Sequence, residues 1–230
     1  MLWPTWILRI RAPGRPLATP AAALALLILV TPHLGAQWRL ESWLGDAWSI
    51  PTSVTFSQVN QPDITATGHW STRPFEPTWY YAGRIARWSG RSAWAFQYVH
   101  DKVYLDDPPP EVKFFRITNG VNFFLGERLW RTSGWEYGLG AGPVMVVPVS
   151  SVRGLTYDHA HGILHSTYEF GGGVVQGNLA RRIRLLPFVY VDLSLMSTAS
   201  YLRVRIANGH ATLLNFALHA QYGLSLQAGK

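Results

Sequence analysis

The stretch that decides the fold is LLNFALHAQYGLSL, residues 213–226. Its residues alternate in polarity with a period of two, which is typical of a β-strand because successive side chains point to opposite faces of a sheet. One face is apolar and consists of Leu214, Phe216, Leu218, Ala220, Tyr222, Leu224 and Leu226. The other face carries Leu213, Asn215, Ala217, His219, Gln221, Gly223 and Ser225. The pattern predicts a strand with one apolar and one mainly polar or small face.

Similar segments recur along the chain. In LPFVYVDLSLM (residues 186–196), Leu193 and Leu195 oppose Asp192 and Ser194. Such segments, separated by turn-forming residues, predict eight antiparallel strands near 37–46, 78–89, 93–104, 113–126, 134–146, 167–180, 184–198 and 213–226. SVTFSQ (53–58) and DITATGHWS (63–71) are expected to form a hairpin within the first long loop.

The N-terminus has the features of an exported protein. Arg9, Arg11 and Arg15 form a basic region, and the apolar run Ala21–Val30 leads to a small-residue cleavage site that ends at Ala36. The apolar core is about 10–14 residues long, short of the roughly 20 that a spanning helix needs. Residues 1–36 are therefore predicted to be a cleaved signal peptide, with an uncleaved anchor as the alternative.

Composition excludes several classes of protein. The chain contains no cysteine, so it has neither a disulfide framework nor a thiolate metal site. Removing residues 1–36 takes away three Arg and no acidic residue, which lowers the net charge from +7 to +4. This modest charge, without a basic stripe, argues against a nucleic-acid partner. Only 14% of residues are charged, against about 25% in soluble domains.

Two all-β folds fit the alternation. A soluble sandwich buries its apolar face, whereas a transmembrane barrel turns that face toward lipid and packs polar residues inside. The export signal, the aromatic residues at segment ends and the alternation of short turns with longer loops favour the barrel. We predict an eight-stranded antiparallel transmembrane β-barrel over 37–230, monomeric, in the outer membrane of a Gram-negative bacterium. Long loops near 47–77, 104–113, 147–167 and 199–212 are expected to face outward.

The inside of such a barrel is just wide enough for side chains, so a general porin is not expected. Inward-facing charges need partners because unpaired burial is unfavourable. We predict an interior salt-bridge network that includes Arg84, Arg116, Glu136 and Asp192.

The outer rim carries the residues that could take part in catalysis or binding. If the rim is catalytic, His100 is the expected metal ligand or general base, supported by Asp101 or Glu111. Lys102 and Arg205 would bind a substrate phosphate, and the further metal ligands would be His69, His165 and His210. The alternative is that His100 is a structural partner within the strand.

Five segments resemble, in order, a small outer-membrane β-barrel family that includes lipid A oxidase and uncharacterised relatives: FEPTWYYAGRIARW (75–88), AFQYVHDKVYL (95–105), ITNGVNFF (117–124), YEFGGGVVQ (168–176) and NGHATLLNFALHAQYGL (208–224). The resemblance implies an eight-stranded barrel whose partner is membrane lipid, a class that includes lipid A. It also implies oxidation of the proximal glucosamine of lipid A, with a divalent metal as cofactor. Two functions therefore stay open: a lipid A-modifying oxidase, and a non-enzymatic barrel that is structural or admits small solutes.

Overall fold

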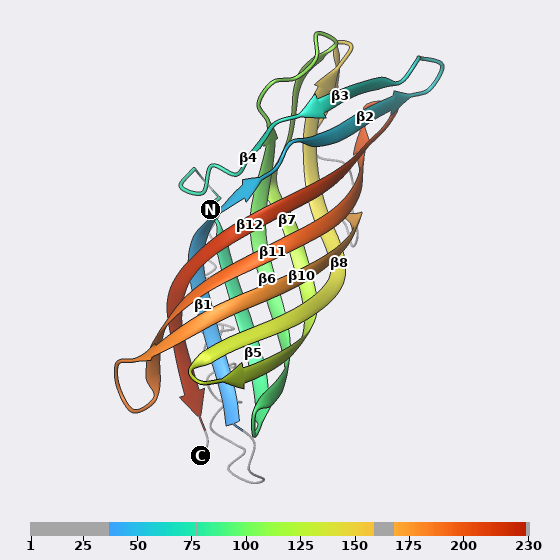
Figure 1. The fold of residues 1–230 in the computed structure, drawn as a ribbon. Helices are drawn as coiled ribbons and strands as arrows, with labels where there is room; N and C mark the ends of the chain where they lie inside the picture. Colours follow the sequence, from blue (N-terminus) through green and yellow to red (C-terminus); the bar gives the residue numbers. More distant parts are fainter. Residues whose placement is uncertain (1–36, 77, 159–167, 229–230) are drawn as a thin grey trace, which may run out of the picture. The chain divides into compact units, whose positions relative to one another are not determined.

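The computed structural model describes residues 37–76, 78–158 and 168–228, which form twelve β-strands and no helix (Figure 1). The strands are β1 (Gln37–Ser49), β2 (Thr52–Gln58), β3 (Ile64–Gly68), β4 (Trp70–Ser71), β5 (Tyr81–Ser89), β6 (Ser92–Leu105), β7 (Val112–Thr132), β8 (Trp135–Val152), β9 (Leu155–Tyr157), β10 (Glu169–Arg184), β11 (Val189–Ile206) and β12 (Gly209–Ala228). Those ranges hold no helix long and apolar enough to cross a membrane. The predicted signal peptide, 1–36, lies outside the described residues.

Hydrogen-bonded pairing connects eight of the strands in a ring. The order is β1, β5, β6, β7, β8, β10, β11 and β12, and β12 pairs with β1 in turn. Every pairing is antiparallel, and the ring is uneven because its strands run from 9 residues in β5 to 21 in β7. The all-β antiparallel prediction is confirmed, and each of the eight expected strands overlaps one strand of the ring.

The remaining strands extend the sheet at one end of the ring. β2 pairs with β12 through Gln58↔Gly209 and forms the expected hairpin with β3. β9 pairs with the end of β8, and β4 pairs with the end of β6. Residues 199–212, expected as a loop, are almost entirely strand, and only Ala207 and Asn208 separate β11 from β12. The turn is this tight because Asn208 adopts a positive φ of 56°, which asparagine tolerates.

On β11 and β12 the polar face points inward. Asn215, His219 and Ser225 are at most 1% exposed, whereas their neighbours Leu214 and Leu224 are 47% and 52% exposed. Apolar side chains therefore cover the outside of this part of the ring.

Along β7 the inward face is apolar instead. Phe115, Phe123 and Leu125 are at most 1% exposed, and the Phe115 ring packs edge-on against Phe56 of β2 with centroids 5.3 Å apart. The prediction that Arg116 lies inside is therefore wrong: its side chain is exposed, and its guanidinium lies 5.4 Å from the Phe114 ring. The reason is that this part of the sheet buries its apolar face, as a soluble protein does.

Candidate functional site

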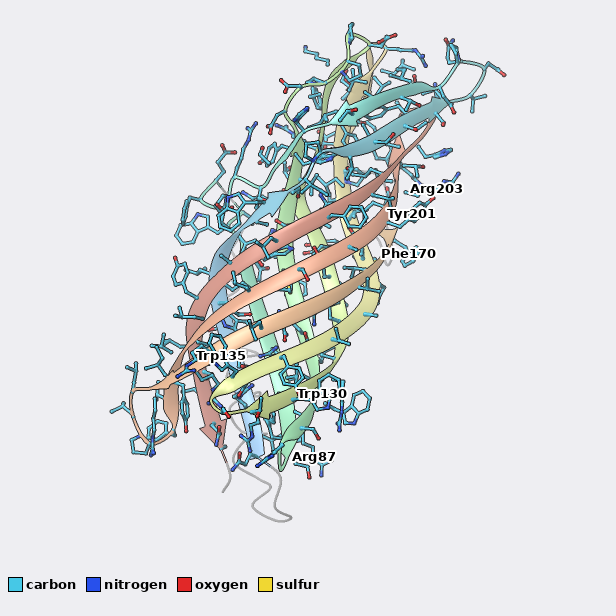
Figure 2. All side chains as sticks on the ribbon, viewed as in Figure 1. Arg87, Trp130, Trp135, Phe170, Tyr201 and Arg203 are labelled. Carbon is cyan, nitrogen blue, oxygen red and sulfur yellow. The ribbon has the colours of Figure 1, made fainter. Side chains whose placement is uncertain are left out.

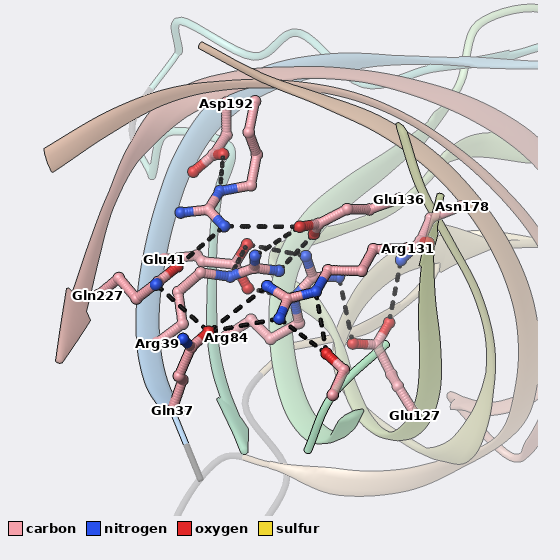
Figure 3. Close-up of polar contacts among 12 residues, drawn as sticks. Gln37, Arg39, Glu41, Arg84, Glu127, Arg131, Glu136, Asn178, Asp192 and Gln227 are labelled. Atoms are coloured by element: carbon pink, nitrogen blue, oxygen red, sulfur yellow. Dashed lines mark hydrogen bonds and ion pairs between the residues drawn. The ribbon is translucent and has the colours of Figure 1, made fainter. Parts of the chain in front are cut away.

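A buried network of charges fills the ring at the end where short turns join β5 to β6, β7 to β8 and β10 to β11 (Figure 3). We call this the end with the short turns. Arg39 of β1 binds both carboxylate oxygens of Glu136 of β8, with 2.6 Å between Nη1 and Oε1. The Nε of Arg39 lies 3.0 Å from Oε1 of Glu41, two residues along β1. Parallel two-point contacts of this kind are the strongest arginine–carboxylate geometry, so Arg39 fastens β1 to β8 across the interior.

A second guanidinium completes the pairing of Glu41. Arg84 of β5 donates from Nε to Oε2 of Glu41 at 2.5 Å and from Nη2 to Oε1 at 2.9 Å. Its Nη1 lies 3.5 Å from Glu127 of β7, which also accepts hydrogen bonds from the amides of Gln176 and Asn178 of β10. Glu127 therefore has both charged and neutral donors.

Arg182 of β10 extends the network to β11. Its Nη1 lies 3.5 Å from Glu136 and its Nε lies 3.3 Å from Asp192. The network therefore joins three guanidinium groups, of Arg39, Arg84 and Arg182, to four carboxylates, of Glu41, Glu127, Glu136 and Asp192.

The strand register positions these side chains. Glu41 lies directly opposite Arg84, and Arg182 lies opposite Asp192, so each pair shares the inner face without any distortion of the sheet. Trp43 lies 4.9 Å from the guanidinium carbon of Arg84. Apolar surroundings of this kind strengthen the ion pairs and make an unpaired charge unfavourable.

Three of the four residues expected in the network, Arg84, Glu136 and Asp192, lie in it, and Arg116 does not. Glu127 and Arg182 were not predicted. The strand containing Glu127 was expected to end at residue 126, and Arg182 falls in ARRI, residues 180–183, which reads as a short turn. Continued alternation with Leu125 and Leu129, both buried on the same face, is the signal that could have placed Glu127 inside.

Above the charges, a layer of neutral polar groups crosses the interior. His219 of β12 lies 3.1 Å from the hydroxyl of Tyr80 through Nδ1 and 3.0 Å from the hydroxyl of Thr198 through Nε2. Gln221 donates to the Tyr80 hydroxyl at 2.8 Å. All four side chains are buried, so this layer closes the space between the charged network and the apolar residues beyond it.

His100 is buried among side chains of the neighbouring strands β5 and β7. It alternates with Phe96 and Tyr98 on the outer face of β6, yet it is only 3% exposed. Its ring stacks on that of Tyr81, with centroids 4.9 Å apart, and its Nδ1 lies 2.8 Å from Oδ1 of Asn122. Neighbouring side chains therefore cover the residue that was expected to be the metal ligand or base.

Asp101 stabilises a bulge in β6, and Lys102 binds the segment that precedes β5. The register of β6 against β7 shifts between Asp101 and Val103, and Asp101 accepts a hydrogen bond from the backbone N–H of Lys102 at 2.7 Å. The Lys102 side chain is fully buried and donates from Nζ to the carbonyl oxygens of Arg73 (2.6 Å) and Glu76 (2.7 Å). The prediction that Lys102 binds a substrate phosphate is therefore wrong, because its ammonium is enclosed by backbone carbonyls.

The structure does not bring the other predicted catalytic and metal residues to His100. Glu111 is exposed and precedes Val112, whereas His100 pairs with Asn122, ten residues further along β7, so the two side chains lie at different levels of the sheet. His69 is exposed beside the Thr52 end of β2, and His210 pairs with Ser57 at the opposite end. His165 lies outside the described residues.

A divalent metal lacks a ligand set in the described part of the chain. No group of three or more His, Asp or Glu side chains there is arranged to hold a metal ion. The residues that the structure describes therefore do not fit the metal expected of an oxidase.

The remaining predicted residue, Arg205, lies at the rim of the ring on β11. Its Nε is 3.7 Å from Glu169 of β10, and Glu169 also accepts a hydrogen bond from the hydroxyl of Tyr157 in β9. Partial burial and this bond to a carboxylate raise the pKa of Tyr157 to about 12. Beside this pair, Nη2 of Arg203 lies 3.4 Å from the His210 ring.

Comparison with known proteins gives likenesses to solved structures but no match by sequence. No family model matches the chain, and no curated protein matches it significantly. Among solved structures, the crystal structure of Neisserial surface protein A (NspA) aligns with a TM-score of 0.38 and 11% sequence identity, over 84% of this chain and 97% of that one.

Proposed function

We propose that the chain is a monomeric, non-enzymatic β-barrel of the Gram-negative outer membrane, in which the ring of eight strands spans the bilayer and membrane lipid is the partner. The observation that carries the proposal is the inverted polarity of β11 and β12. Asp192 and His219 are buried inside, whereas Leu193 and Leu218 stand exposed outside. A soluble sheet with this arrangement would expose apolar surface to water and bury charge, so the arrangement suits lipid as the surrounding medium.

The exposed aromatic residues support the same proposal. Towards the end with the short turns, the outer face carries Trp38, Trp94, Trp135, Tyr137 and Tyr222. Towards the other end it carries Trp48, Tyr81 and Tyr201. Figure 2 places Trp130 and Trp135 near one end of the ring and Tyr201 near the other. Aromatic side chains at two levels, with Leu139 and Leu195 between them, are typical of the two interfaces of a membrane.

The filled interior argues against transport. The charged network, the neutral layer of Tyr80 and His219 and the apolar residues above them occupy successive levels inside the ring. Packed side chains leave no path for water through a ring of eight strands. A structural role in the membrane is therefore favoured over the admission of small solutes.

Lipid A oxidation forms no part of the proposal. His100 is covered, Lys102 is enclosed, and the described residues hold no metal ligand set. The predicted chemistry consequently has no observation in its favour.

The test combines folding, location and activity. The full chain, produced in a Gram-negative host, should fractionate with the outer membrane and migrate faster on gels when it is not boiled, because a folded barrel resists detergent. In planar bilayers it should give no conductance steps. The mass spectrum of lipid A should be the same in cells with and without the chain. Recovery as a soluble protein that lacks heat-dependent migration would contradict the barrel, and a new lipid A species would contradict the absence of enzymatic activity.

A further inference from the structure

A trough runs along the outer face of β10 and β11. Four depressions follow one another along these two strands, with volumes of about 980, 540, 770 and 490 Å³. Neighbouring depressions share residues: the first two share Gly173 and Tyr201, and the second and third share Val175 and Ala199. They therefore form one continuous surface feature.

Small residues make much of the floor of this trough, which is interrupted by Val175 of β10, 58% exposed between Gly173 and Gly177. Gly177 lies opposite Ser197 in the strand register, and Gly173 and Ala199 lie further along the same two strands. Larger exposed residues stand on either side, among them Leu139 of β8 and Leu214, Phe216 and Leu218 of β12. The floor is therefore low because most of its residues lack side-chain bulk.

The folded chain itself does not require glycine at these two positions. A Cβ at Gly177 would come no closer than 3.5 Å to the Ser197 hydroxyl, and one at Gly173 no closer than 3.9 Å to the Gly142 carbonyl oxygen. Both distances are ordinary van der Waals contacts, and neither residue has a positive φ. Packing within the chain leaves both glycines unexplained, whereas an occupant of the trough would explain them.

The trough ends in positive charge. Beyond Tyr201, the outer face of β11 continues with Arg203 (Figure 2) and then with Arg205. All three line the largest of the four depressions. The carboxylate in this depression, Glu169, is nearly buried and already pairs with Arg205 and Tyr157. Among the residues that the structure describes, no carboxylate lies within ion-pairing distance of Arg203. The guanidinium of Arg203 is therefore available to an anion.

The dimensions match one leaflet of a membrane. Arg203 and Ser197 are six residues apart, or about 20 Å along the strand. At the usual strand tilt this is roughly 15 Å across the membrane, half of the approximately 30 Å hydrocarbon thickness. An apolar trough of this length with cations at one end has the shape and charge of a phosphate-bearing lipid.

We propose that this trough, which we call the β10–β11 trough, holds one phosphate-bearing lipid, with an acyl chain along Gly173, Gly177, Ser197 and Ala199 and the phosphate at Arg203 and Arg205. The inference rests on the proposed membrane barrel and deepens it, because it assigns one anionic lipid to a defined place. A guanidinium pair suits a phosphate because its N–H groups donate to the phosphate oxygens.

The test uses the full chain, folded in a neutral maltoside detergent, and three probes. Palmitoyl lysophosphatidylglycerol offers both chain and phosphate, palmitoyl monoacylglycerol offers the chain alone, and inorganic phosphate offers the charge alone. Native mass spectrometry counts the molecules that each chain retains. We expect one lysophosphatidylglycerol to be retained, with far weaker retention of the other two probes.

Variants separate this site from ordinary lipid contact. Filling the trough by Gly177→Leu should weaken retention of lysophosphatidylglycerol about tenfold, and Arg203→Gln combined with Arg205→Gln should do the same without changing retention of monoacylglycerol. The matched control is Gly83→Leu, also an outward glycine with room for a Cβ, 3.7 Å from its nearest neighbour but outside the trough. This variant should bind as the unchanged chain does.

If Gly177→Leu does not fold, Ala199→Leu fills the same trough from β11. Equal retention by the unchanged chain and by all folded variants would overturn the site and mean non-specific lipid contact only. A shift from dimer to monomer in Gly177→Leu, with lipid retention unchanged, would overturn it in favour of a second copy of the chain. Failure of the barrel proposal is a separate result, because the unchanged chain would then lack heat-dependent migration.

Discussion

Arg39 and Glu136 meet through a two-point contact across the interior of the ring, although they are 97 positions apart in the sequence. β1 and β8 are not neighbours in the ring, so no backbone hydrogen bond holds this part of the two strands together. The side-chain pair is therefore a transverse connection that the backbone does not provide. Its partners Glu41 and Arg182 carry the connection on to β5 and β11.

The first prediction concerns this pair. Arg39→Ala should lower the free energy of unfolding by about 3–5 kcal/mol, because it leaves Glu136 and Glu41 with buried, partly unpaired charge. Arg116→Ala, at an exposed position on β7, should change it by about 0.5 kcal/mol or less. The measurement is a urea titration of heat-dependent gel migration in detergent. Similar losses in the two variants would mean that the inward and outward faces are exchanged.

A matched double substitution should behave differently. Arg39→Met together with Glu136→Leu removes both charges and keeps apolar bulk, so its effect should be much smaller than that of Arg39→Ala alone. A double variant as unstable as the single one would show that the volume of the side chains, rather than the unpaired charge, decides the stability.

Close strand approach gives the second prediction. A Cβ at Gly223 of β12 would collide with the carbonyl oxygen of Ser42 on β1, whereas at Gly83 of β5 it would have 3.7 Å to its nearest neighbour. Gly223→Ala should therefore destabilise the chain by about 1–3 kcal/mol, and Gly83→Ala should have little effect. The same urea titration compares them, and equal midpoints would show that β1 and β12 adjust without strain.

The third prediction tests the assignment of Lys102. Lys102→Met keeps the length of the side chain but leaves the carbonyl oxygens of Arg73 and Glu76 without their donor. Opening of this segment should become roughly tenfold more frequent, since an unsatisfied buried group costs about 1–3 kcal/mol. The rate of chymotrypsin cleavage after the exposed Phe75 reports that opening.

Lys113→Met provides the control for Lys102, since Lys113 is exposed on β7. Its cleavage rate should equal that of the unchanged chain. If Lys102→Met also leaves the rate unchanged, the ammonium does not hold the segment.

Topology gives the fourth prediction, and the lack of cysteine in the sequence makes it easy to test. A membrane-impermeant maleimide added to intact cells should label Gln61→Cys, in the turn between β2 and β3, because this end of the ring is expected to face outward. It should leave Arg91→Cys, in the turn between β5 and β6, unlabelled until the cells are broken. The reverse pattern would invert the proposed orientation.

Much of the fold could be predicted because alternation reports which residues share a face. Leu214 and Asn215 show this on β12, as Leu193 and Asp192 do on β11. Alternation does not say which face is inside, however. Assuming an apolar exterior for the whole chain failed at Arg116, because that part of β7 encloses Phe56 and other apolar side chains.

The rim residues were harder to place from sequence because their roles depend on distant contacts. The sequence HDK shows three polar groups in a strand, but not that the carbonyls of Arg73 and Glu76 enclose the lysine. Nor does it show that a register shift follows Asp101. The β10–β11 trough could not be predicted from the sequence for a related reason. Whether Gly173 and Gly177 leave open space on the surface depends on their neighbours across the sheet.

The charged network also bears on how the ring can form. Its members come from six strands, from Arg39 on β1 to Asp192 on β11, and the contacts link strands that are distant in the chain. If the ring spans a membrane, as proposed, an incomplete sheet would leave several of these charges facing lipid without partners, which is strongly unfavourable. Folding intermediates in which only some strands are paired should therefore be sparsely populated within the membrane. Pairing of β1 with β12 is therefore expected to be cooperative. Incomplete sheets should remain in water or bound to a helper protein until all strands have paired.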